Sequence, residues 1–184
     1  MRKWLLAVWI AAVPLAAQDR VIELDSTQAK VEFKLGATLH TVRGTFSIKR
    51  CNIRFVPATG RFTGELVLDA TSASTDNDGR DRKMHKSVLE SDRYPEIVFH
   101  PARLNGELAA AGTSKLEVIG WLAIHGTERE ISVPLSVDAT GNRYRLTGEL
   151  SFPYVNWGMK NPSTLILRVG DQVTIAIQAA AEAR

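Results

Sequence analysis

The polar residues best spaced for chemistry are Arg80, Asp81 and His85. On a helix, Asp81 and His85 stand four residues apart on one face, so the carboxylate could orient the imidazole. Arg80, or Lys83 beside it, could supply positive charge to an anionic group. One interpretation is a polar cluster that meets the headgroup of a bound molecule. The alternative is a solvated helix that carries ordinary surface pairs.

Catalysis by this cluster would require an activated nucleophile or base next to the Asp81–His85 pair. Ser72, Ser74 and Thr75 are nearby in the sequence, but no pattern around them indicates activation. The sequence contains no glycine-rich phosphate loop, nucleophile elbow or Walker pattern. These observations predict a protein that is not an enzyme and has no cofactor.

Metal chemistry is not indicated either. The histidines stand far apart, without a second ligand at metal-binding spacing, at His40, His85, His100 and His125. Cys51 is the single cysteine, so the chain cannot form an internal disulfide. Cys51 belongs to an alternating segment with Ile53 and Phe55, which favours a small buried hydrophobe over a reactive thiol.

Two further sites could contribute to the rim of a pocket. The segment 154–162 is rich in large side chains, and its Trp157 and Met159 could line a rim or pack against the end of a sheet. His125 stands at a strand end before Gly126, where a role in the turn competes with a role in a pocket. The sequence alone does not decide between these interpretations.

The N-terminus has the pattern of an export signal. Arg2 and Lys3 precede an uncharged apolar run over 4–15, and small residues follow before Gln18, so we expect a signal peptide at 1–17 and one domain at 18–184. The run is short for a membrane span. Removing the signal takes away two basic residues and no acidic one, so the net charge falls from +3 to +1. That balance gives little support to a nucleic-acid partner.

Strict alternation of apolar and polar residues dominates the rest of the chain, and it is typical of strands with one dry and one wet face. Gly44 falls on a dry face, where it allows a bend or close packing. We expect about ten short strands, separated mostly by tight turns. They are predicted at 21–25, 30–35, 41–49, 52–56, 62–70, 97–104, 116–125, 130–137, 144–152, 164–169 and 173–177.

One segment breaks the period of two. Met84, Val88 and Leu89 have helical spacing, and Asp78 is a candidate N-cap, so a short helix is expected from about Arg80 to Leu89 inside a long connection. Periodicity does not distinguish a sandwich from a barrel that closes around a ligand.

In order and spacing, the segments 41–46, 72–75 with 80–81, 94–99 and 120–127 resemble the YceI-like family of bacterial lipid-binding proteins. The loop Trp157-Gly158-Met159 also resembles one branch of that family. The likeness runs over nearly the whole of 18–184. One departure is Thr27-Gln28 after Asp25-Ser26, where many members carry a His-Ser pair.

The resemblance implies an all-β fold, an extended antiparallel lipocalin-like β-barrel with one short helix in a long connection. It implies a periplasmic carrier of a polyisoprenoid or related amphiphile, such as a prenyl pyrophosphate, an isoprenoid quinone or a fatty-acid derivative. For the apolar tunnel we predict Phe33, Leu35, Phe46, Leu122, Ile124, Leu150 and Phe152. For the headgroup or rim we predict Arg80, Asp81, His85, His125, Trp157 and Met159.

Two alternatives remain at this point. One is an enzyme that acts on a hydrophobic substrate through Asp81 and His85. The other is a barrel with a filled core that works through its surface, for example in transient contact with a membrane or a membrane protein. An edge strand could also pair with a second copy to give a homodimer.

Overall fold

The predicted alternating rows form long strands. The computed structural model describes residues 21–38 and 40–184, so the signal predicted at 1–17 lies outside the described residues. The strands are β1 (Ile22–Ala37), β2 (Thr41–Cys51), β3 (Arg54–Val56), β4 (Arg61–Thr63), β5 (Leu66–Ser74), β6 (Glu96–Asn105), β7 (Gly112–Ile124), β8 (Thr127–Thr140), β9 (Arg143–Pro153) and β10 (Val169–Ala183).

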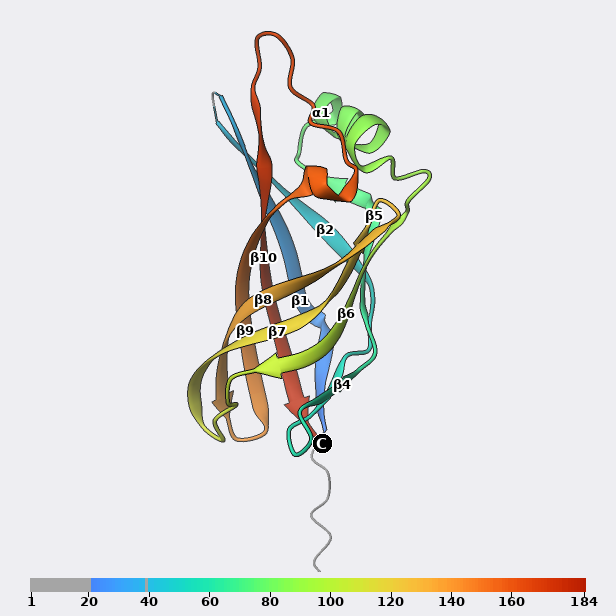
Figure 1. The fold of residues 1–184 in the computed structure, drawn as a ribbon. Helices are drawn as coiled ribbons and strands as arrows, with labels where there is room; N and C mark the ends of the chain where they lie inside the picture. Colours follow the sequence, from blue (N-terminus) through green and yellow to red (C-terminus); the bar gives the residue numbers. More distant parts are fainter. Residues whose placement is uncertain (1–20, 39) are drawn as a thin grey trace, which may run out of the picture.

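Eight of these strands close into an antiparallel barrel (Figure 1). The ring runs β1, β2, β5, β6, β7, β8, β9, β10 and back to β1. In the pairing that closes it, Val31 stands opposite Ile177 and Phe33 opposite Ile175. The short hairpin β3–β4 bridges β1 and β6 at the end of the barrel where β1 begins and β10 ends. The predicted all-β, lipocalin-like barrel is therefore confirmed.

The two ends of the barrel differ in the segments that form them. At one end, which we call the mouth, lie the β1–β2 connection, the segment 75–95, the β7–β8 turn and the segment 154–168 (Figure 1). The other end carries the β3–β4 hairpin and the β6–β7 and β8–β9 connections. We call it the closed end, because a cluster of buried side chains fills it: Ile22, Phe55, Leu116, Val137, Ala139, Tyr144 and Ala181.

The predicted helix is present with different boundaries. Helix α1 (Asp78–Met84) continues into a π-helix, η1 (His85–Leu89). The N-cap is Asn77, one residue before the predicted Asp78, and its side chain accepts a hydrogen bond from the Arg80 amide at 2.9 Å. A short 3₁₀ helix, η2 (Tyr154–Trp157), follows β9. None of the described helices has the length and apolarity needed to cross a membrane.

The strand predicted at 164–169 is wrong, because only Val169 of that segment belongs to a strand. Residues 164–167 form a turn, in which the Thr164 amide donates to the Leu167 carbonyl at 2.8 Å. The apolar run 165–167 does not show the alternation seen in rows such as 30–35, so periodicity gave no support to a strand there. The strands predicted at 21–25 and 30–35 are a single strand, β1, with an irregularity between Asp25 and Lys30.

Two small residues on β2 behave largely as predicted. A side chain at Gly44 would place its Cβ 2.3 Å from the Phe33 ring and 2.4 Å from the Ser74 carbonyl oxygen. Only glycine therefore lets Phe33 lie across the inner face of β2. Cys51 is half-buried, and loss of solvent raises the pKa of its thiol, which suits a packing residue rather than a nucleophile.

Candidate functional site

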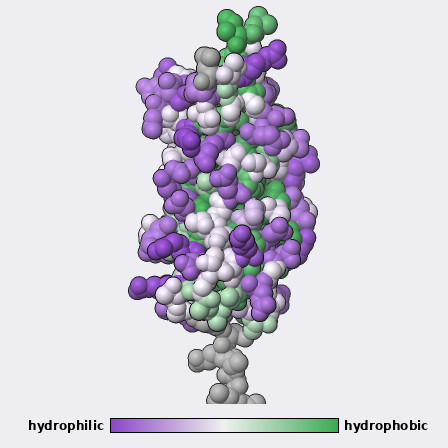
Figure 2. Space-filling model, turned by 90° about the vertical axis from the view of Figure 1, so that its left-hand side faces the viewer, coloured by the Kyte–Doolittle hydropathy of each residue, from purple (hydrophilic) through white to green (hydrophobic). Residues whose placement is uncertain are grey.

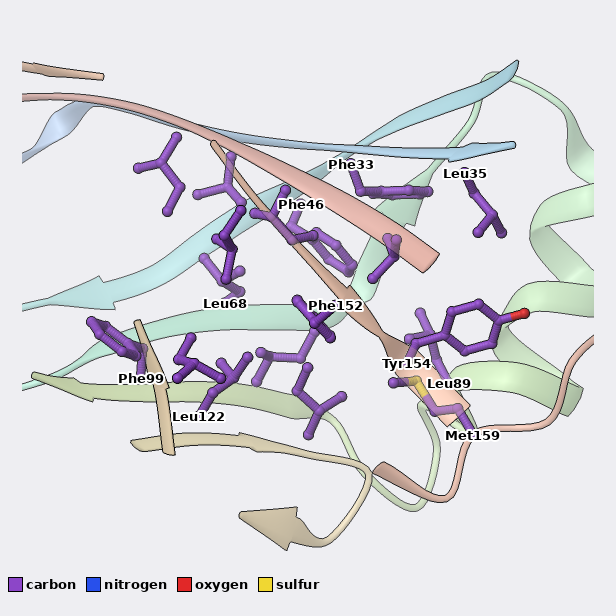
Figure 3. A pocket seen from close by; sticks show the side chains of 18 of the residues that line it. Phe33, Leu35, Phe46, Leu68, Leu89, Phe99, Leu122, Phe152, Tyr154 and Met159 are labelled. Atoms are coloured by element: carbon purple, nitrogen blue, oxygen red, sulfur yellow. The ribbon is translucent and has the colours of Figure 1, made fainter. Parts of the chain in front are cut away.

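A cavity of about 490 Å³ occupies the barrel interior. That volume is within the range of about 300–1,000 Å³ that is usual for sites of small organic ligands. Side chains from opposite walls converge on it, among them Phe33, Phe46, Leu122 and Phe152 (Figure 3). The alternative of a completely filled core is not what the structure shows, because the inward-facing rows leave space between them.

The wall of the cavity is almost entirely apolar. All seven residues predicted for the tunnel line it, from β1, β2, β7 and β9: Phe33, Leu35, Phe46, Leu122, Ile124, Leu150 and Phe152. Their place follows from the strict alternation of their strands. Contact of these side chains with a ligand remains a prediction.

Several lining residues were not among the predicted ones. Leu68 on β5 and Phe99 on β6 line the cavity from the part of the wall between β2 and β7 (Figure 3). Each stands in a run of three apolar residues, 66–68 and 97–99, so alternation alone could not show which of these side chains face inward. Leu89 and Tyr154 line the cavity at the mouth. Their position depends on how the segments 75–95 and 154–168 fold over the barrel, and no local pattern encodes that.

The closed end forms the floor of the cavity. Four residues line the cavity and also pack against the buried cluster of the closed end: Leu24, Phe62, Leu135 and Leu146. Phe62 stacks on Phe55 with ring centroids 4.6 Å apart. A long molecule could therefore enter the barrel from the mouth and would stop at this aromatic pair.

Polar groups of the cavity gather at the mouth. Apart from the hydroxyl of Tyr154, which donates to the Gly170 carbonyl at 3.1 Å, the polar side chains that line the cavity are His40, Thr75, Arg80 and Lys83. Arg80 donates through Nε to Thr75 Oγ1 at 2.7 Å and through a terminal nitrogen to the Thr75 carbonyl at 2.9 Å. A guanidinium carries five N–H donors, so Arg80 keeps donors for a ligand.

Asp81 anchors helix α1 to the end of β5. Its carboxylate accepts hydrogen bonds from the Thr75 hydroxyl, the Thr75 amide at 3.0 Å and the Ser74 hydroxyl at 3.1 Å. Loss of solvent opposes ionisation of this carboxyl, but these hydrogen bonds outweigh it. The pKa of Asp81 therefore lies below its ordinary value.

His85 lies on the same face of the helix as Asp81, but the two side chains do not contact each other. The Nε2 atom of His85 is 2.9 Å from the Ala73 carbonyl oxygen, and Nδ1 is 3.0 Å from Ser91 Oγ. Because a carbonyl only accepts, Nε2 carries the proton and Nδ1 accepts from Ser91. The predicted orienting contact is therefore wrong, and neither nitrogen is free to take a proton from a substrate.

The remaining predicted rim residues divide between the wall of the cavity and its support. Met159 lines the cavity. Trp157 lies behind Phe152 with ring centroids 4.8 Å apart, and its Nε1 donates to the Leu122 carbonyl at 3.0 Å. It therefore holds the wall without being part of it.

His125 does not line the cavity. It has a positive φ of 52° in the β7–β8 turn, its ring lies 4.4 Å from that of Tyr94, and its Nε2 is 3.7 Å from a Glu90 carboxylate oxygen. This placement favours the role in the turn. Within residues 21–38 and 40–184, no three histidine, cysteine, aspartate or glutamate side chains gather in the manner of a metal site.

Comparison with known proteins gives a consistent result. The family model of the YceI-like domain matches residues 23–181. A UPF0312 protein of Vibrio parahaemolyticus is 28% identical over 156 residues, which cover 77% of each chain. A UPF0312 protein of Vibrio cholerae is 27% identical over 141 residues, which cover 72% of each chain.

Solved structures share the fold at low sequence identity. A polyisoprenoid binding domain from Saccharophagus degradans superposes with a TM-score of 0.68 at 18% identity, and the match covers 89% of this chain and 98% of that one. BcnA of Burkholderia cenocepacia superposes with a TM-score of 0.69 at 19% identity, over 85% and 98% of the two chains.

Proposed function

Because the chain belongs to the YceI-like family, we propose that it is a binding protein that carries one long-chain amphiphile inside the barrel. The observation that carries this proposal is the apolar cavity of about 490 Å³, whose polar lining residues among the described ones stand at its mouth. Burial of apolar chain contributes roughly 0.8 kcal/mol per methylene, so a long hydrocarbon would bind there without many polar contacts.

The ligand class we propose is a polyisoprenoid or a chain of similar length with an anionic head. Arg80 and Lys83 line the cavity at the mouth. Lys83 donates one hydrogen bond, to the Pro162 carbonyl at 2.9 Å, and an ammonium has three donors. A prenyl pyrophosphate suits these cations best, and an isoprenoid quinone or a fatty-acid derivative would occupy the same wall. The domain from Saccharophagus degradans, which is described as polyisoprenoid binding, supports this choice.

We also propose that the protein is not an enzyme and works in the periplasm. Both nitrogens of His85 are engaged and Asp81 is held by Thr75, so the pair that an enzyme would use is committed to structure. The periplasmic location rests on the predicted signal at 1–17.

The direct test is native mass spectrometry of the protein purified from its own cells, followed by extraction and identification of any bound lipid. We expect a stoichiometric long-chain adduct. A protein that carries no lipid and also takes up no added prenyl lipid would refute the proposal.

A matched pair of variants makes the test specific. Leu150→Asp places a charge on the wall of the cavity, whereas Thr147→Asp places the same charge on the exposed face of the same strand. We expect Leu150→Asp to lose the adduct and Thr147→Asp to keep it. Circular dichroism would confirm that both variants fold. Equal lipid content in the two folded variants would contradict the assignment of the cavity.

A further inference from the structure

The most exposed apolar side chains of the described chain stand at the tip of the mouth. Leu165 and Ile166 are 102% and 93% exposed, and Leu167 is 36% exposed. Figure 2 shows hydrophobic residues at the outermost point of this end, while polar residues dominate the flank of the barrel in the same view. Isolated exposed apolar residues are common on proteins, but adjacent, fully exposed ones usually mark an interaction site.

The tip is held out by a network of hydrogen bonds. The Thr164 amide donates to the Leu167 carbonyl at 2.8 Å, and the Leu167 amide donates to Thr164 Oγ1 at 3.1 Å. One step further in, the Val169 amide donates to Ser163 Oγ at 2.8 Å. These bonds close a turn whose two central residues are Leu165 and Ile166, so both side chains project away from the barrel.

The base of this turn is fixed to two other segments of the mouth. The Thr38 amide donates to the Arg168 carbonyl at 2.9 Å, and the Arg168 amide donates to Thr38 Oγ1 at 3.0 Å. On the other side, Lys83 of helix α1 donates to the Pro162 carbonyl at 2.9 Å. The apolar tip therefore has a defined position relative to the mouth.

The inner side of the same segment belongs to the cavity. Pro162, Leu167 and Val169 line it, next to Tyr154 and Met159. Leu167 is the last residue of the turn and also part of the cavity wall. Apolar side chains thus connect the outermost tip with the interior on this side of the mouth.

Charge around the mouth differs from charge at the closed end. The mouth segments 38–40, 75–95, 125–126 and 154–168 contain seven lysines and arginines and five acidic residues. The closed-end segments 21–25, 51–65, 105–113, 138–144 and 180–184 contain four basic and six acidic residues. Six of the seven basic residues of the mouth are exposed: Arg82, Lys83, Lys86, Arg93, Lys160 and Arg168.

We propose that the turn Thr164–Leu167 inserts into an anionic phospholipid bilayer and sets the mouth of the barrel on the membrane surface. A narrow convex tip suits insertion into a fluid apolar layer, whereas a stable protein interface buries about 800 Å² on each partner. Basic residues around the tip would meet anionic headgroups. Apolar insertion and electrostatic attraction are each weak, but together they hold proteins at a membrane surface. The use of this docking for ligand exchange rests on the proposed function, but the docking itself does not.

Vesicle flotation tests the docking directly. The form without residues 1–17 is the right sample, because it contains every described strand and lacks the apolar run 4–15, which would itself bind lipid. We expect it to float with phosphatidylcholine vesicles that contain about one third phosphatidylglycerol, and to bind less at high salt because the headgroup attraction is screened. Failure to float with these vesicles at low salt would overturn the proposal.

The decisive variant is the double substitution Leu165→Ser with Ile166→Ser, which changes two exposed side chains and no buried one. We expect its partition onto anionic vesicles to fall at least about tenfold. Trp121→Ser is the matched control, because Trp121 is 44% exposed on strand β7, away from the tip. The control should bind vesicles like the wild type. An equal loss of vesicle binding in both variants would show nonspecific adsorption and overturn the assignment of the tip.

A second measurement separates docking from ligand binding. Uptake of geranylgeraniol from dilute aqueous dispersion should be unchanged in the double variant, while its uptake from vesicles should slow at least about tenfold. Vesicle binding without any uptake would refute the proposed ligand and leave the docking in place. If sedimentation without lipid shows a dimer that the double variant loses, the tip covers a second copy, and the membrane proposal is wrong.

Discussion

At the closed end, Phe55 stacks on Phe62 with ring centroids 4.6 Å apart, whereas at the mouth Asp81 and Lys83 join segments through hydrogen bonds to Thr75 and Pro162. Packing of apolar side chains does not depend on the ionisation of any group, whereas contacts made by charged side chains respond to pH and are screened by salt. The two ends therefore differ in the contacts that hold them. Packing alone forms the floor, whereas at the mouth polar contacts add to the packing of buried residues such as Leu89, Trp157 and Met159.

The largest expected effect compares the same truncation in the two regions. Phe55→Ala removes a buried ring from the filled end and should lower the free energy of unfolding by about 3–5 kcal/mol. Phe46→Ala removes a half-buried ring that already faces open space, so we expect a loss of about 1–2 kcal/mol. Denaturant unfolding of the ligand-free protein measures both values.

The same two variants should rank in the opposite order when their affinity for ligand is compared. Phe46 lines the cavity and Phe55 does not, so Phe46→Ala should weaken binding of a prenyl lipid more than Phe55→Ala does. Equal losses of stability and of affinity in the two variants would mean that the ends of the barrel do not differ as described.

A smaller effect is expected from the buried polar contacts of the mouth. His85→Ala removes the partners of the Ala73 carbonyl and of Ser91, and it should cost about 1–3 kcal/mol of unfolding free energy. His100→Ala, on the exposed outer face of β6, is the control and should change stability by less than about 0.5 kcal/mol. Thermal unfolding followed by circular dichroism compares them, and an unchanged midpoint in His85→Ala would refute the anchoring role.

The smallest expected effect depends on pH. The pKa of Asp81 in the folded state is below the ordinary value of 3.8, so its stabilising contribution is present above that value and is lost as the pH falls through the folded pKa. Asp81→Asn should therefore cost about 1 kcal/mol near neutral pH and progressively less below about pH 4. Thr75→Val, which removes one donor, should reproduce part of this change.

Unfolding titrations at several pH values give the measurement. For truncations at the closed end, the difference in unfolding free energy from the wild type should not shrink as the pH falls, because no ionised group takes part in the Phe55–Phe62 contact. A constant difference between Asp81→Asn and the wild type down to pH 2 would contradict the sign of the pKa shift.

The sequence predicted the barrel wall better than the mouth. Alternation is a local property, so the inward direction of Phe33, Leu150 and Phe152 could be assigned residue by residue. Whether inward rows meet in a filled core or leave a cavity depends on the spacing between walls. The bulky pair Phe55 and Phe62 fills one end of the barrel. In the sequence, a row that lines the cavity, such as Val31 to Leu35, has the same alternation as a row that does not.

The mouth depends on contacts between distant segments. The sequence placed Asp81 and His85 on one face of a helix, but it could not show that the end of β5 supplies separate partners to each. Leu165 to Leu167 suggested a strand because the residues are apolar, whereas the hydroxyls of Ser163 and Thr164 fold them into a turn. Side chains that bond to their own backbone compete with strand formation in this way.

Closure of the ring by β1 and β10 also constrains how the chain acquires its structure. These two strands are the first and last of the barrel, and the Val21 and Arg184 backbones pair with each other at 2.9 and 3.0 Å. Contacts between residues so far apart in sequence are slow to form. Until Val169–Ala183 has been synthesised and has reached its place, β1 and β9 each present an unpaired edge that can join other chains. The interval before closure is thus the period in which this protein is most exposed to aggregation.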